Sequence, residues 1–206
     1  MARTWRQKFF AWGIDLVMRV YEPRIAPRKQ ALFGGLRGTV VEIGPGTGPN
    51  LKYFDPSIEY VGIDPNVYMH PYLVREANRL GMAQVQMLEG TAAEIPLPDA
   101  SVDAVVGTLV LCSVPHQAEV LAEVKRVLKP GGRYYFIEHV AAESLTWTSF
   151  VQRLIKPLWC CCADGCHVDR KSWEAIELAG FSEVEMERFR LDFPVVAPHI
   201  MGSARR

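Results

Sequence analysis

The chain has 206 residues, of which 49% are apolar and 22% are charged. These values are typical of one globular domain and exclude a disordered chain. The 23 basic and 23 acidic residues give a net charge of zero. This balance argues against a nucleic-acid partner, because binding to phosphate backbones relies on an excess of Lys and Arg.

The five cysteines do not form the pattern of a disulfide framework. Their number is odd, and three of them are adjacent, at positions 160 to 162. Reduced thiols in the cytoplasm fit this pattern better. The longest stretch without Asp, Glu, Lys or Arg covers residues 104–118, which is shorter than the roughly 18 apolar residues of a membrane span.

Residues 1–36 are predicted to form an N-terminal amphipathic helical segment. In a helix from Trp5 to Tyr21, one stripe is charged and the opposite stripe is apolar. The charged stripe comprises Lys8, Asp15, Arg19 and Glu22, and the apolar one Phe9, Trp12, Leu16 and Val20. Because the charges are of mixed sign, we expect this helix to pack on the domain. Peripheral contact with a membrane surface is the alternative.

Short apolar strands and amphipathic helices alternate from residue 39 to residue 139, which predicts βαβ units and a parallel sheet. The predicted strands are Thr39–Ile43, Ile58–Asp64, Gln84–Leu88, Val102–Leu109 and Arg133–His139, and the helices between them are Val67–Leu80 and His116–Leu128.

The alternation stops after His139. There we expect helices Ser144–Leu158 and Arg170–Ala179, then an antiparallel strand pair, Glu183–Phe189 and His199–Arg205. The domain therefore covers residues 37–206, with a lid insertion at about 143–168.

A glycine-rich loop, Gly44-Pro45-Gly46-Thr47-Gly48, follows the first strand. Its spacing differs from the G-x-G-x-x-G of dinucleotide sites. Glu42 precedes the loop and Asp64 ends the second strand, so a pyrophosphate would be repelled and a cationic cofactor attracted. S-adenosylmethionine (SAM) has no phosphate and carries a sulfonium and an ammonium. The carboxylate of Asp64 can accept hydrogen bonds from both ribose hydroxyls of SAM.

Four segments, Val40–Gly48, Gly62–Pro65, Gly90–Pro96 and Leu128–Gly132, resemble class I SAM-dependent methyltransferases. The resemblance implies an α/β, Rossmann-like fold with helices on both faces of a seven-stranded, mostly parallel sheet that ends in an antiparallel hairpin. It also implies a cofactor site, in which the glycine loop holds the methionine part, Asp64 the ribose and residues 91–93 the adenine. The predicted cofactor-binding residues are Glu42, Gly44, Gly46, Gly48, Asp64, Pro65, Thr91, Ala92, Ala93 and Leu109.

A narrower resemblance concerns the second half of the chain. Val105–Val114, Phe136–Glu143, Asp164–Cys166 and Pro198–Ile200 are similar to the alkyl-thiol S-methyltransferase branch, methyltransferase-like protein seven. This resemblance implies S-methylation of a small hydrophobic thiol by in-line methyl transfer. The alternatives are an O- or C-methyltransferase acting on a quinone, phenol or polyketide, and a protein that binds SAM without catalysis.

The acceptor side of the site is predicted from four residues. His139, at the end of a strand, is the candidate general base, although a hydrogen bond to the lid or to Glu138 would also explain it. Trp147 and Trp159 belong to an aromatic segment expected to cover a hydrophobic acceptor, with a core helix as the alternative. Cys112 is expected to line the acceptor pocket or to be buried.

No metal site is predicted. Adjacent cysteines at positions 160 to 162 cannot easily converge on one tetrahedral zinc. The favoured interpretation is that these cysteines act as soft apolar side chains that fill space in the lid. Binding of a metal or metalloid between Cys160 and Cys166 is left as the alternative. The sequence makes no prediction of the oligomeric state.

Overall fold

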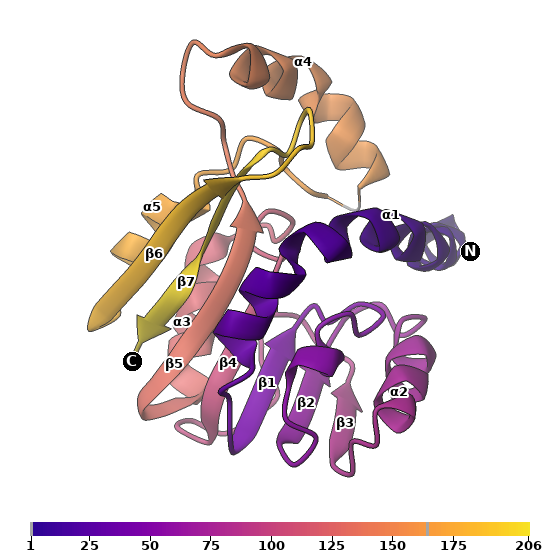
Figure 1. Cartoon of the computed structure of the whole chain (residues 1–206), viewed down its shortest axis with the longest axis vertical. Helices are drawn as coiled ribbons and strands as arrows, with labels where there is room; N and C mark the ends of the chain where they lie inside the picture. The colour runs from indigo at the N-terminus through magenta and orange to yellow at the C-terminus, as the bar shows by residue number, and fades with distance from the viewer. Residues whose placement is uncertain (1, 164) are drawn as a thin grey trace.

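The computed structural model describes residues 2–163 and 165–206. Seven strands form one sheet in the order β3-β2-β1-β4-β5-β7-β6 (Figure 1). β1 to β5 are parallel, and β7 lies antiparallel between β5 and β6. The predicted fold class is confirmed. The strands are β1 (Thr39–Ile43), β2 (Glu59–Ile63), β3 (Val85–Leu88), β4 (Val102–Thr108), β5 (Leu128–His139), β6 (Glu183–Arg190) and β7 (Pro198–Arg205).

Helices cover both faces of the sheet because its central strands are apolar on both sides. Val40 and Val41 of β1 point to opposite faces and belong to separate hydrophobic cores. α3 and α5 form the core with Val41, and α1, α2 and the short 3-10 helix η1 form the core with Val40. The helices are α1 (Ala2–Phe33), η1 (Leu51–Tyr53), α2 (His70–Arg79), α3 (Gln117–Val127), α4 (Trp147–Cys162) and α5 (Ser172–Leu178).

Two predicted boundaries are wrong. β5 begins at Leu128 instead of Arg133, because Leu128 pairs with Val102 before residues 129–132 bulge from the ladder. The predicted helix end at Leu158 is also wrong, because α4 continues through the three adjacent cysteines to Cys162. α1 continues past Tyr21 to Phe33, within the predicted segment 1–36, and the other predicted elements are present with ends that differ by a few residues.

The second half of α1 packs on the domain, where Tyr21, Ile25 and Phe33 are buried. A buried ion pair adds to this packing, with Lys29 Nζ 2.7 Å from Glu22 Oε2. The side chains of residues 8, 9, 12, 15 and 16, which make up most of the predicted stripes, lie outside the described part of the chain. Contact of this helix with a membrane surface therefore stays a prediction. Among the described helices, none has the length and apolarity needed to cross a membrane.

Replacing Lys29 with Met should lower the free energy of unfolding by about 3 kcal/mol, because it leaves Glu22 partly unpaired in a buried position. Denaturant unfolding followed by circular dichroism measures the change. Glu187→Gln is the matched control, since Glu187 pairs with Arg28 on the exposed side of the same helix. Its stability should stay close to that of the unsubstituted chain. Equal losses in the two variants would contradict a role of the buried pair in holding α1.

Candidate active site

A cavity of about 710 Å³ lies at the carboxyl ends of the central strands. The strand order reverses between β1 and β4, which is where open α/β sheets bind ligands. The volume lies in the usual range for a small-molecule site. Its lining comes from α1, the loops after β1, β2 and β4, and the segment after β3: Met18, Lys29, Glu42, Gly44, Pro45, Gly46, Thr47, Pro49, Asn50, Ile63, Asp64, Pro65, Asn66, Met69, Thr91, Ala92, Thr108, Leu109, Val110, Ser113, Val114 and Pro115.

Glu42, near the end of β1, is buried and hydrogen-bonded on both carboxylate oxygens. Asn50 Nδ2 donates to Oε1 at 2.6 Å, and the Tyr60 hydroxyl donates to Oε2 at 2.7 Å. Burial raises the pKa of Glu42 to about 7, against the effect of these two donors. The carboxylate is thus costly to ionise where it is buried, and a cationic ligand would favour its ionised form.

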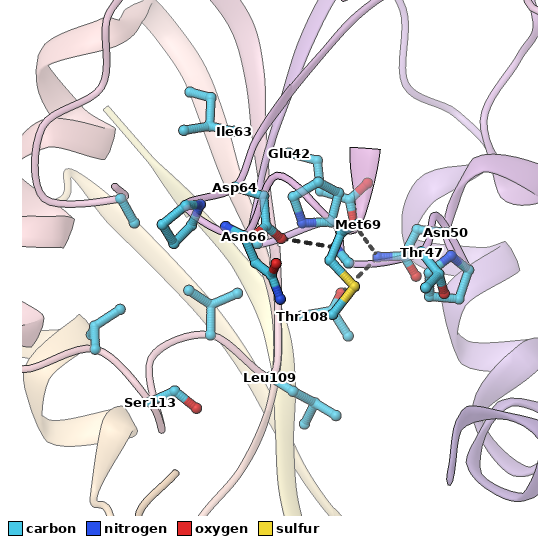
Figure 2. A pocket seen from close by; sticks show the side chains of 18 of the residues that line it. Glu42, Thr47, Asn50, Ile63, Asp64, Asn66, Met69, Thr108, Leu109 and Ser113 are labelled. Carbon is cyan, nitrogen blue, oxygen red and sulfur yellow. Dashed lines mark hydrogen bonds between the residues drawn. The ribbon is translucent and has the colours of Figure 1, made fainter. Parts of the chain in front are cut away.

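Asn50 is a cavity residue that the sequence analysis missed. Its Nδ2 bridges Glu42 and Thr108, donating to Thr108 Oγ1 at 3.0 Å (Figure 2). Its Oδ1 is buried and has no hydrogen-bond partner among the described residues. An unpaired buried acceptor is costly, and the ammonium of SAM is a donor that would satisfy it. The cavity therefore fits the cofactor predicted from the sequence.

The backbone of the glycine loop after β1 adopts a conformation that residues with a Cβ would disturb. Gly44 has φ +60°, and a Cβ there would lie 2.8 Å from Val110 Cγ2. Gly46 also has a positive φ, and its N–H donates to Asp64 Oδ2 at 3.2 Å. Asp64 Oδ1 accepts from the Asn66 N–H at 2.8 Å. A carboxylate can accept about four hydrogen bonds, so Asp64 can hold this loop and also accept from ribose hydroxyls.

The cavity wall formed by residues 108–115, beside the glycine loop, is held by Glu138, a second residue missed from the sequence. This carboxylate, buried at the end of β5, accepts from the N–H groups of Val110 at 2.8 Å and Leu111 at 2.9 Å. Burial raises its pKa to about 7, and these backbone donors oppose the shift. Leu109, at the start of the wall, has φ +58°. The Glu138 carboxylate thus stabilises a turn from which Leu109 and Val110 line the cavity.

Eight of the predicted cofactor-binding residues line the cavity, and Gly48 and Ala93 do not. The eight are Glu42, Gly44, Gly46, Asp64, Pro65, Thr91, Ala92 and Leu109. Lys29 also lines it, although no local pattern marked it. Burial lowers the pKa of Lys29, and the Glu22 carboxylate opposes this shift. The roles of all these residues in holding a cofactor stay predictions.

None of the four residues predicted for the acceptor side lines the cavity. His139 is only 4% exposed, and its Nε2 lies 3.0 Å from Cys166 Sγ. Cys112 is buried next to the same pair. Trp159 donates its N–H to Cys166 Sγ at 3.4 Å, and Trp147 is 78% exposed.

In Figure 1, α4 lies beyond the carboxyl end of β5. Asp164, from the motif 164–166, lies outside the described residues.

The match to known proteins agrees with the geometry. Residues 41–136 match the family model described as a methyltransferase domain. The strand order, the glycine loop and the cavity with two carboxylates and an unpaired acceptor define a class I SAM-dependent methyltransferase. SAM is accordingly its cofactor.

Relatives that match most of the chain identify the branch. The chain is 38% identical over 210 residues to the thiol S-methyltransferase TMT1A of Homo sapiens, covering 96% of this chain and 86% of the relative. It is 37% identical over 206 residues to the thiol S-methyltransferase TMT1B of Rattus norvegicus, covering 92% and 82%. The chain belongs to the same family as these two proteins.

Solved structures agree on the fold. A SAM-dependent methyltransferase from Aquifex aeolicus superposes with a TM-score of 0.60 at 22% identity, covering 89% of this chain and 88% of that one. The [4+2]-cyclase SpnF superposes with a TM-score of 0.69 at 19% identity, covering 89% and 80%. One fold thus carries different reactions, and the chemistry has to be argued from the site.

SAM affinity should rise several-fold from about pH 6 to about pH 7.5. Burial raises the pKa of Glu42 to about 7. A bound cation lowers it, so binding at acidic pH must first remove a proton. Calorimetry over this range, in two buffers that differ in ionisation enthalpy, measures both the affinity and the proton release. Glu42→Gln should flatten the dependence. An affinity that falls with pH would contradict this placement of the cofactor cation.

Asp64→Ala should weaken SAM binding by about 2 kcal/mol, roughly 30-fold, because it removes charged acceptors from two hydroxyls. Equilibrium dialysis with labelled SAM measures the loss. Glu177→Ala, at an exposed carboxylate on α5, is the control and should bind normally. Unchanged affinity in Asp64→Ala would place the ribose elsewhere.

Proposed function

We propose that this protein transfers the methyl group of SAM to the sulfur of a small apolar thiol. Its relatives TMT1A and TMT1B are named thiol S-methyltransferases. The observation that carries the proposal is the distribution of charge in the cavity. Of the described lining residues, the ionisable ones are Lys29, Glu42 and Asp64, and the wall at 108–115 has none.

A wall without a base suits a nucleophile that ionises without help. A thiol with a pKa near 8.5 is a few per cent thiolate at neutral pH, whereas a phenol with a pKa near 10 is about 0.1% ionised. The apolar side chains of Leu109, Val110 and Val114 keep water from such a thiolate. An anion stripped of water is more reactive toward a cation, because the charges of the two reactants cancel in the transition state.

The polar residues of the cavity position the donor. When bound, SAM supplies a methyl group activated by the positive charge of its sulfonium. Asp64 would accept from the ribose hydroxyls and Asn50 Oδ1 from the ammonium, while Glu42 supplies negative charge. These contacts would fix the direction from which the acceptor approaches, and alignment is the main requirement of an in-line displacement.

A methyl-transfer assay with labelled SAM tests the proposal. Benzyl mercaptan and 4-methylphenol are acceptors of matched size that differ in the nucleophilic atom. We expect the thiol to react about tenfold faster or more at pH 7, because a larger fraction of it is ionised. Equal rates would favour an O-methyltransferase. Tight SAM binding without turnover of any thiol or phenol would favour a binding protein.

A further inference from the structure

Two cysteines and a histidine from distant parts of the chain meet next to the side chains of residues 108–115 that line the cavity. Cys112 follows β4, His139 ends β5, and Cys166 lies between α4 and α5. All three are buried, and the sulfur and nitrogen atoms they offer lie within 4.8 Å of one another. The sequence analysis considered a metal only at the cysteines from 160 to 166. The fold instead brings in Cys112, from another strand end.

The donor set is that of a zinc site. Zinc in proteins is bound by Cys sulfur at about 2.3 Å and His nitrogen at about 2.0 Å. A tetrahedron with such bonds places its ligands about 3.5 to 3.8 Å apart, so the present cluster needs only small side-chain movements. His139 Nε2 and Cys166 Sγ are now 3.0 Å apart and would separate slightly.

Charge also favours a divalent ion. Two thiolates and one Zn²⁺ form a neutral group, which a buried site can hold at low cost. A monovalent ion would leave a net negative charge beside the carboxylate of Glu138, which is fully buried.

The surroundings hold the ligands in place. The Trp159 ring N–H donates to Cys166 Sγ at 3.4 Å, and Ser113 Oγ lies 3.5 Å from Cys112 Sγ. Donors of this kind orient and stabilise metal-bound thiolates.

We propose that Cys112, His139 and Cys166 bind a zinc ion. The ion ties the segment between α4 and α5 to the ends of β4 and β5. Ser113, next to Cys112, lines the cavity, so the ion also fixes the wall against which the acceptor lies. Three protein ligands leave one coordination position for an exchangeable ligand. In this role His139 is a metal ligand and not a general base. The assignment does not depend on the identity of the acceptor.

Metal analysis of the untagged full chain, purified under reducing conditions, tests the proposal. After chelation, titration with ZnCl₂ should restore one zinc per chain. Titration with CoCl₂ should produce thiolate-to-cobalt charge-transfer absorption. Cys112→Ser, Cys166→Ser and His139→Gln should each lose most of the bound zinc. Cys162→Ser is the matched control, since this thiol is exposed and outside the cluster, and it should keep the metal.

Calorimetric SAM binding checks that each variant is folded. If the ligand variants fail to fold, the cobalt spectrum of the unsubstituted chain still decides, because thiolate ligation has its own absorption. Three results would overturn the proposal. They are no zinc uptake by the reduced chain, full retention of zinc by Cys166→Ser, and a Cys112–Cys166 disulfide whose reduction yields no metal binding.

Discussion

The site depends on one buried carboxylate at the tip of the central strand. Glu42 joins β1 to β2 through Tyr60, and to β4 through Asn50 and Thr108. Burying such a charge is expensive unless something compensates it. Two neutral donors compensate it only in part, so its pKa stays raised. A positively charged ligand completes the compensation. The same hydrogen bonds that join three neighbouring strands therefore also favour a positively charged ligand at this site.

A second carboxylate organises the neighbouring wall at 108–115 by accepting hydrogen bonds from its backbone. Buried N–H groups must find acceptors, and those of Val110 and Leu111 find theirs in Glu138 behind the loop. The side chains of the loop are thereby left to form an apolar surface. The cavity therefore combines ionisable residues, Lys29, Glu42 and Asp64, with a wall at 108–115 that has no ionisable side chain.

Local patterns in the sequence predict most of the fold and the donor half of the site. Apolar runs mark the strands, and the glycine loop with Glu42 and Asp64 marks the strand ends where a ligand binds. The missed features depend on distant contacts. Asn50 and Lys29 have no local signal, since only folding brings them to the cavity. The cluster of Cys112, His139 and Cys166 joins three segments that no spacing rule connects. The extension of β5 to Leu128 depends on its partner in β4.

The N-terminal helix contributes Met18 and Lys29 to the cavity wall, and this has a thermodynamic consequence. A ligand that touches these side chains binds better when the helix is docked, and the bound ligand in turn favours docking of the helix. Such coupling is reciprocal by necessity. Anything that pulls Met18 and Lys29 away from the cavity lowers the affinity for the nucleoside by the factor by which the bound nucleoside favours docking of the helix.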